Sequence, residues 1–331
     1  MPRVEGSGGM ASFRLKFESS LKRRGVDVIH DPAQPADAVL LIAGSRHLGS
    51  LWKAKRGGTR IVQRLDGLNW VQRARWSGFR YHLRGEYGNL LLVFLRNRIA
   101  DRVIYQSEFV RQWWQDWYGK SKVPERVVLN GVDLDFYSPD GSAADPPQNG
   151  RYRMLIIEGS LAGGLNTGLF HAVSLAKELA PRFPMEIVVA GVVDRRTRDR
   201  ITGEAQVPVN FLGVVPRERI PEWARSAHIF YSAEVNPPCP NSVIEALACG
   251  LPVVGFDTGS LNELVIGDAG RLAPYGSDPW KLDSPDVRPL AQAVAEILDA
   301  PVRFKKAARL QAQAALGLER MVDDYLRILL E

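Results

Sequence analysis

The sequence predicts an α/β protein with two domains, each built on a parallel sheet. Short apolar stretches that suit buried strands alternate with amphipathic stretches that suit helices, which is the pattern of strand–helix–strand units. A chain of 331 residues is long enough for about two domains with a core each. The alternation stops at 141–150, which is rich in Pro, Gly, Asp and Ser, and then restarts. We therefore expect a linker there.

The individual elements follow from the same alternation. In the first half it predicts helices at 10–24, 83–96 and 108–117, and strands at 26–29, 38–42, 60–63 and 102–105. In the second half it predicts strands at 154–157, 186–190, 209–212 and 229–231, helices at 168–179 and 218–225, and a mostly helical end at 289–330. The apolar run at 90–95 reads as a core helix. We expect domains over 1–140 and 151–315, with a last helix over 316–331.

The most informative stretch follows the strand that ends at Tyr231. After a Pro-rich loop, Ser242 and Glu245 form a capping-box pattern at the start of a short helix. Gly250 is placed to end that helix in a left-handed conformation. A short apolar run then predicts a strand buried on both faces, and the capping-box pattern recurs from Ser260. Such loop-to-helix turns leave backbone N–H groups free and are ready phosphate sites.

These residues resemble the donor-site signature of the retaining, GT-B-fold glycosyltransferases of family 4. The positions that carry the resemblance are Asn241, Glu245, Ala246, Gly250, Pro252, Val253, Gly259, Glu263 and Leu264. The stretch at 129–133 is similar to the family's segment between the two domains, and the stretch at 100–104 to a strand and turn of its first domain. Gly8 and Gly9, ahead of a helix, resemble its N-terminal glycine loop. The resemblance thus spans nearly the whole chain.

The resemblance implies two Rossmann-like domains of the GT-B fold and the transfer of a sugar with retention of configuration. The donor would be a UDP- or GDP-linked sugar, and the acceptor a glycan, a lipid-linked molecule or a small molecule. The nucleotide-sugar is a co-substrate, so no cofactor and no metal are expected. In the resembled fold the last helix crosses back onto the first domain.

The resemblance also implies roles for particular residues on the donor side. Glu245 would accept hydrogen bonds from the ribose hydroxyls, for which a carboxylate is suited. The donor phosphates would be met by backbone groups of the loops and helix starts. The residues concerned are Gly8, Gly9, Gly159, Ser160, Asn241, Ser242 and Val243.

Other candidates lie elsewhere in the two domains. Asp66 and Arg64 stand at the end of a predicted strand, where parallel sheets bind ligands. Many relatives have a His near this point, and Asp66 is the expected substitute as a catalytic group. Glu234 is the second catalytic candidate, because it is the acidic residue nearest the start of the donor loop. Arg64 and Trp70 are acceptor-side candidates.

Two departures from the family pattern leave two hypotheses open. The family has two Glu in the donor loop with seven residues between them, but here Pro237 takes the first of these positions. The family's Arg and Lys, which grip the diphosphate, have no counterpart in 158–166. The chain is therefore either an active glycosyltransferase or a catalytically weak relative that binds a sugar nucleotide or scaffolds polysaccharide synthesis. In addition, only 1–4 precede the glycine loop, so either the sheet starts with a short strand or the true start lies upstream.

The first half carries a basic region at 51–126, with sixteen Lys or Arg against six Asp or Glu and many aromatic residues. Such a surface could contact an anionic membrane or a lipid phosphate, bind nucleic acid, or be a solvated face over a Trp-rich core. No nucleic-acid motif accompanies the charge, so nucleic acid is not expected as a partner. Peripheral membrane contact through 51–126 and the solvated face remain as alternatives.

Bulk features favour a cytoplasmic protein, with peripheral attachment to the inner face of the plasma membrane as an option. No apolar run approaches the roughly 18 residues that span a bilayer, and the start lacks the pattern of a signal peptide. The two cysteines suit a reducing compartment, and Cys249 is expected to be buried. The five His residues form no cluster with Asp or Ser that would indicate a catalytic group.

Overall fold

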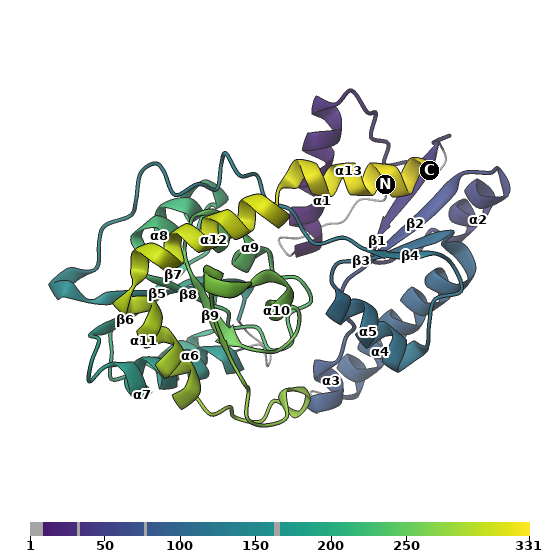
Figure 1. Cartoon of the computed structure of the whole chain (residues 1–331). Coiled ribbons are helices and arrows are strands. Elements are labelled where there is room, and N and C mark those ends of the chain that lie inside the picture. The colour runs from purple at the N-terminus through teal and green to yellow at the C-terminus, as the bar shows by residue number, and fades with distance from the viewer. Residues whose placement is uncertain (1–8, 32–33, 76–77, 162–165) are drawn as a thin grey trace. The chain divides into compact units, whose positions relative to one another are not determined.

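A computed structural model describes residues 9–31, 34–75, 78–161 and 166–331 (Figure 1). The chain folds into two compact units, one of Met1–Gly131 with Leu318–Glu331, and one of Val132–Gly317. Each unit holds one parallel sheet with helices around it, so the predicted α/β class is confirmed. Met1–Val4 and Gly8 lie outside the described residues.

The sheet of the first unit has four parallel strands. In sheet order these are β1 (Ala38–Ile42), β2 (Arg60–Leu65), β3 (Arg102–Tyr105) and β4 (Glu125–Val127). The helices of this unit are α1 (Gly9–Arg23), α2 (Leu48–Arg56), α3 (Val71–Ala74), α4 (Phe79–Phe94), α5 (Glu108–Tyr118) and α13 (Leu318–Leu330), with a π-helical turn at Leu95–Ile99.

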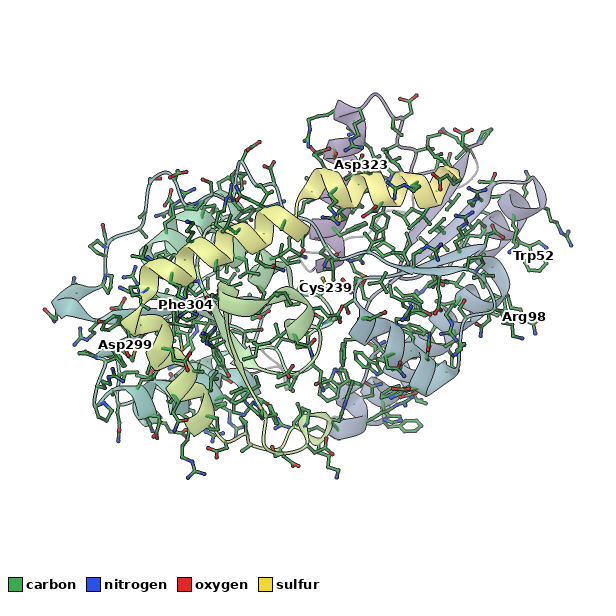
Figure 2. All side chains as sticks on the ribbon, in the orientation of Figure 1. Trp52, Arg98, Cys239, Asp299, Phe304 and Asp323 are labelled. Carbon is green, nitrogen blue, oxygen red and sulfur yellow. The ribbon has the colours of Figure 1, made fainter. Side chains whose placement is uncertain are left out.

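The last helix, α13, packs beside α1 on one face of this sheet. Tyr325 of α13 meets Phe13 and Phe17 of α1, with ring centroids 5.2 and 5.3 Å apart. At the helix surfaces, Arg24 pairs with Asp323, which Figure 2 labels, and with Glu319. The two ends of the chain therefore share one core.

The strand predicted at 26–29 is not present, and this expectation was wrong. Gly25 has φ +71° and ends α1, and the Val26 amide still donates to the Leu21 carbonyl at 3.0 Å. Val26 and Asp27 are exposed, and Val28 packs, partly buried, against the core of the first unit without pairing with a strand of the sheet. The predicted strands at 38–42, 60–63 and 102–105 are all observed.

The second unit has a sheet of six parallel strands. In sheet order these are β10 (Gly270–Ala273), β9 (Val253–Phe256), β8 (Ile229–Tyr231), β5 (Tyr152–Ser160), β6 (Met185–Val192) and β7 (Val209–Gly213). The helices of this unit are α6 (Thr167–Leu179), α7 (Arg195–Glu204), α8 (Ile220–Ser226), α9 (Asn241–Ala248), α10 (Leu261–Leu264), α11 (Arg288–Asp299) and α12 (Pro301–Ala315). From β5 the chain builds outward through β6 and β7, and then crosses to β8 on the other side of β5. The strand order therefore reverses between β5 and β8.

The division of the chain falls at 131 and 132, ahead of the boundary expected at 140. The stretch at 141–150, expected as a linker, lies within the second unit. Arg225 of α8 donates to the carbonyls of Ser138 and Ser142 at 2.8 and 2.9 Å, and the Ala144 amide donates to the Glu222 carbonyl at 3.0 Å. These hydrogen bonds hold the stretch against α8, which composition alone does not indicate.

The end of α9 is as predicted, but its start is not. Gly250 has φ +70°, and the amides of Gly250 and Leu251 close the helix on the carbonyls of Leu247 and Ala246. The expected capping box at Ser242 was wrong, because α9 already begins at Asn241 and no side chain caps it. The second expected box also fails, since Ser260 precedes α10 but its buried hydroxyl has no hydrogen-bond partner in the described chain.

Candidate functional site

The carboxyl edge of the second sheet has the topology of a ligand site. In open parallel sheets, ligands bind beyond the carboxyl ends of the two strands where the strand order reverses. Here these strands are β5 and β8. Glu158 and Gly159 stand near the end of β5, and Glu234 stands three residues after β8. Three candidates from the sequence, Gly159, Ser160 and Glu234, thus reach this edge, together with Glu158, which was not singled out as a site residue.

Gly159 and Ser160 occupy the last positions of β5. Gly159 is exposed, and of Ser160 only the backbone is described. Glu234 is partly buried, and burial raises the pKa of its carboxyl to about 7. A carboxyl group with such a pKa can exchange a proton near neutral pH.

The start of α6 packs directly on the backbone that leads to Glu234. A Cβ atom added at Gly168 would lie 1.8 Å from the carbonyl oxygen of Ala233. No side-chain rearrangement can relieve this contact, because the obstructing atom belongs to the backbone. Gly168 therefore fixes how closely α6 approaches the loop after β8.

We expect Gly168→Ala to distort this edge of the sheet. The backbone must shift to admit the methyl group, which should cost about 2 kcal/mol or more in the free energy of unfolding. Thermal unfolding measures the effect. Gly203→Ala in α7 is the matched control, because a Cβ atom there would meet nothing within 4 Å. An equal melting temperature for the two variants would contradict the predicted close packing.

The N-terminus of α9 also faces this edge, since α9 follows the loop after β8. Asn241, Ser242 and Val243 are its first three residues. Their backbone N–H groups have no acceptor within the helix, and the helix dipole adds positive charge at this end. The start of α9 is therefore suited to bind a phosphate, as the sequence predicted.

Glu245 lies one turn into α9 and interacts with the hydroxyl of Tyr137. Tyr137 is fully buried; burial raises the pKa of its hydroxyl, and the charge of Glu245 raises it further. Nε of Arg217, which follows β7, donates to the Tyr137 hydroxyl at 3.4 Å. Neither partner was predicted from the sequence, although Tyr137 lies four residues after the stretch at 129–133. The stretch at 158–161 contains no Lys or Arg, and Arg217 is a positive charge in the second unit that lies beside Tyr137 instead.

In the first unit, Arg64 lies within a buried polar network. Its side chain is 1% exposed and donates to Gln106 and Asn130 at 2.9 Å each, and it forms an ion pair with Asp66. The guanidinium also lies 4.1 Å from the ring centroid of Phe13. Arg64 therefore joins several elements beneath the surface, and Asp66 is the part of the pair that solvent reaches.

Asp66 follows β2 and is partly exposed. Its carbonyl accepts a hydrogen bond from the Trp114 indole at 2.9 Å, which fixes the backbone. Trp70 is partly exposed just before α3, and Gly9 is the exposed first residue of α1. These candidates belong to the first unit, and the donor-loop candidates to the second.

The basic region at 51–126 divides into buried and exposed parts. Trp113 and Trp114 are buried in the core of the first unit, as the solvated-face interpretation expects. Trp52 and Arg98 are exposed (Figure 2). The expected core helix at 90–95 was wrong in part, because Leu90 is 60% exposed whereas Leu95 is buried. Leu90 belongs to a row of apolar residues on α4 that faces solvent, whereas Leu95 comes after the end of α4 and faces the core.

Other features of the described ranges do not contribute to this site. A hollow of about 450 Å³ lies beside the C-terminal end of α9, where Cys249 and Arg309 line it. Cys249 is buried as expected, and burial raises the pKa of its thiol to about 12. Nowhere in these ranges do three or more His, Cys, Asp or Glu side chains gather as they would around a metal ion. No helix in them has the length and apolar character to cross a membrane.

Comparison with known proteins finds a family match within the second unit. Residues 159–300 match the family described as glycosyl transferases group 1. The mannosyltransferase LpsB of lipopolysaccharide core biosynthesis, from Rhizobium meliloti, is 25% identical over 218 residues, which are 61% of this chain and 57% of LpsB. An exopolysaccharide phosphotransferase of Streptomyces coelicolor is 25% identical over 221 residues, which are 65% of this chain and 21% of that protein. The chain thus spans about a fifth of the length of the phosphotransferase and a little more than half of the length of LpsB.

Solved structures extend the comparison to the whole fold. HepE of Anabaena, in complex with UDP, superposes with a TM-score of 0.71 at 15% identity and covers 99% of this chain and 98% of its own. WaaG, a glycosyltransferase involved in lipopolysaccharide biosynthesis, superposes with a TM-score of 0.68 at 12% identity, with the same coverage. The predicted GT-B fold is confirmed.

Proposed function

We propose that this chain, in which residues 159–300 belong to the glycosyl transferases group 1 family, moves a sugar from a UDP- or GDP-linked donor to an acceptor. The acceptor is a glycan, a lipid-linked molecule or a small molecule, and the configuration at the transferred carbon is retained. One observation carries the proposal: the edge where the strand order reverses lies within the family match and is bordered by the N-terminus of α9.

On the donor side, the nucleotide lies along this edge. The backbone N–H groups of Asn241, Ser242 and Val243 bind the diphosphate, and Glu245 accepts hydrogen bonds from the ribose hydroxyls. Tyr137 holds the Glu245 carboxylate in place. HepE, which has the same fold, has been solved with UDP-glucose, and this supports a UDP-linked donor.

The reaction needs placement and charge stabilisation more than acid–base groups. The acceptor hydroxyl attacks the anomeric carbon on the face that the diphosphate leaves, and the departing phosphate oxygen takes the hydroxyl proton. A new glycosidic bond forms as the bond to the diphosphate breaks, so no protein nucleophile is required. Asp66 and Glu234 are the proposed catalytic groups, and the site uses neither a cofactor nor a metal.

A transfer assay separates an active enzyme from a catalytically weak relative. Radiolabelled UDP-glucose and GDP-mannose are incubated with the protein and with lipid and glycan extracts, and the products are separated by chromatography. The proposal predicts a labelled product that Glu245→Ala abolishes. Donor binding without any product would favour the sugar-nucleotide-binding or scaffold role.

We also propose that the first unit attaches to an anionic membrane surface through α4. Five large apolar residues recur along this helix at spacings of three and four, which place them on one face. They are each 43–64% exposed and comprise Phe79, Leu83, Tyr87, Leu90 and Phe94. Arg80 and Arg84 are exposed on the same helix and form no ion pair within the described chain. An apolar face with flanking arginines is the pattern of an interfacial helix.

Vesicle flotation tests this attachment. We expect the protein to float with vesicles that contain phosphatidylglycerol and not with pure phosphatidylcholine, and to dissociate as salt screens the arginines. The double variant Leu83→Ser/Leu90→Ser should lower the bound fraction about tenfold or more, because both side chains lose apolar burial. Val214→Ser/Val302→Ser, exposed in the second unit, is the control. Equal binding by both double variants would contradict the proposed role of α4.

A further inference from the structure

We propose that Glu158 and Glu234 act as a pair that binds hydroxyl groups of the donor's sugar and disfavours sugars with an anionic substituent. This inference rests on the proposed function and adds to it the class of sugar that the donor site accepts. Glu158 lies near the end of β5 and Glu234 lies three residues after β8, and between these two strands the strand order reverses.

The backbone around Glu158 is built to present this side chain. Ile157 pairs with Ala190 and Ser160 with Val192, so that two residues of β5, Glu158 and Gly159, stand opposite one residue of β6. Such a bulge re-aims a side chain at the end of a strand and is common next to active sites. The residue opposite is Gly191, where a Cβ atom would lie 1.9 Å from the Glu158 carbonyl oxygen. Only glycine allows this approach.

The two carboxyl groups interact with each other. Burial raises the pKa of Glu158 well above its ordinary value, and the negative charge of Glu234 raises it further. Burial alone raises the pKa of Glu234 to about 7. The pair therefore retains a proton near neutral pH, which leaves one group that donates a hydrogen bond and one that accepts. Sugar hydroxyls both donate and accept, so they match such a pair.

Several buried polar atoms at this edge lack a partner in the described chain. They include Oε1 of Glu158 and Nδ2 of Asn236, whose residue is only 3% exposed. Asn236 also has φ +56°, a strained conformation of the kind that occurs at functional sites. Unsatisfied groups of this kind are costly, and a ligand with hydroxyl groups would satisfy them.

Charge decides which part of the donor lies here. The negative charge that the pair carries repels a diphosphate, which is better placed at the start of α9, and it likewise repels a sugar carboxylate. The neutral sugar is the part of a nucleotide-sugar that suits the pair. The donor sugar is therefore neutral or cationic at this position and is not a uronic acid.

Calorimetry tests the inference with UDP, UDP-glucose, GDP and GDP-mannose on the full chain. The quantity of interest is the gain in affinity of each sugar conjugate over its bare diphosphate. Glu158→Gln and Glu234→Gln should each lower this gain and leave affinity for the diphosphate nearly unchanged. The loss should be about 10-fold or more for Glu234→Gln, since hydrogen bonds to charged groups are the strong ones. Glu218→Gln, exposed in the same unit, is the control.

The affinity for UDP-glucuronate relative to UDP-glucose is a second measurement, and it would not change if the pair had only a structural role. The wild type should bind UDP-glucuronate more weakly than UDP-glucose, and Glu234→Gln should narrow that difference because the repelling charge is gone. The Gln variants should fold, since an acid whose pKa is raised in the folded state costs stability as pH rises from about 4.5 to 7. Their melting temperatures at pH 8 should therefore equal or exceed that of the wild type. Glu234→Asp, which keeps the charge, should retain the discrimination.

The outcomes distinguish the two claims. If a diphosphate binds and both Gln variants keep the full gain from the sugar, the pair has no role in sugar binding and the proposed function stands. If neither UDP nor GDP binds the wild type, the proposed function fails and the inference fails with it.

Discussion

Replacing Glu245 with Ala is expected to lower the rate of sugar transfer by about 100-fold or more. The carboxylate is proposed to accept two ribose hydroxyls, and each such hydrogen bond to a charged group is among the strong ones. The substitution also leaves the buried Tyr137 hydroxyl without the carboxylate that it meets. Initial rates at a fixed donor concentration, with the product quantified by chromatography, measure the effect.

Two further variants make this prediction specific. Tyr137→Phe removes the hydroxyl beside Glu245 but keeps the carboxylate, so we expect a smaller loss of rate. Glu218→Ala removes an exposed carboxylate of the same unit and should leave the rate unchanged. A Glu245→Ala protein with wild-type melting temperature and wild-type rate would refute the assigned role.

Replacing Arg64 with Leu is expected to destabilise the protein by about 3 kcal/mol or more. The guanidinium is buried and serves Asp66, Gln106 and Asn130 together, so its loss leaves several polar groups without a donor. Buried polar groups that lose their hydrogen-bond partner are costly, and Gln106 and Asn130 are both buried. Thermal or urea unfolding, followed by circular dichroism, measures the change.

The control for this prediction is Arg98→Leu, which removes an exposed arginine (Figure 2). Such a surface change should alter the free energy of unfolding by no more than about 0.5 kcal/mol. If the two arginine variants unfolded alike, the network around Arg64 would not stabilise the first unit. In that case the role of Arg64 as an acceptor-side residue would need to be considered again.

The parallel sheets could be predicted from sequence because buried strands are short apolar runs between helical stretches. β3 and β8 were predicted at their observed bounds. The segment at 26–29 misled the same reasoning. It has the apolar residues of a strand, but it pairs with no strand of the sheet. The exposure of Leu90 was equally hidden, because an apolar run looks the same whether it meets a core or solvent.

The candidate site shows a similar division. The helix that carries Glu245 could be predicted because a loop and a helix start leave local marks in sequence, although its first residue and its cap were not predicted correctly. The pairing of Glu158 with Glu234 could not, because it depends on two strands, far apart in the chain, being neighbours in the sheet. The bulge opposite Gly191 and the contact of Tyr137 with Glu245 depend on tertiary packing in the same way.

Isothermal calorimetry of the whole chain with UDP, GDP and ADP tests the proposed donor site most directly, with Glu245→Ala titrated in parallel. The account predicts that one of these nucleotides binds with a micromolar Kd and that the variant loses this binding. Failure of all three to bind the wild type, or equal binding by the variant, would contradict a donor site at the carboxyl edge of the second sheet.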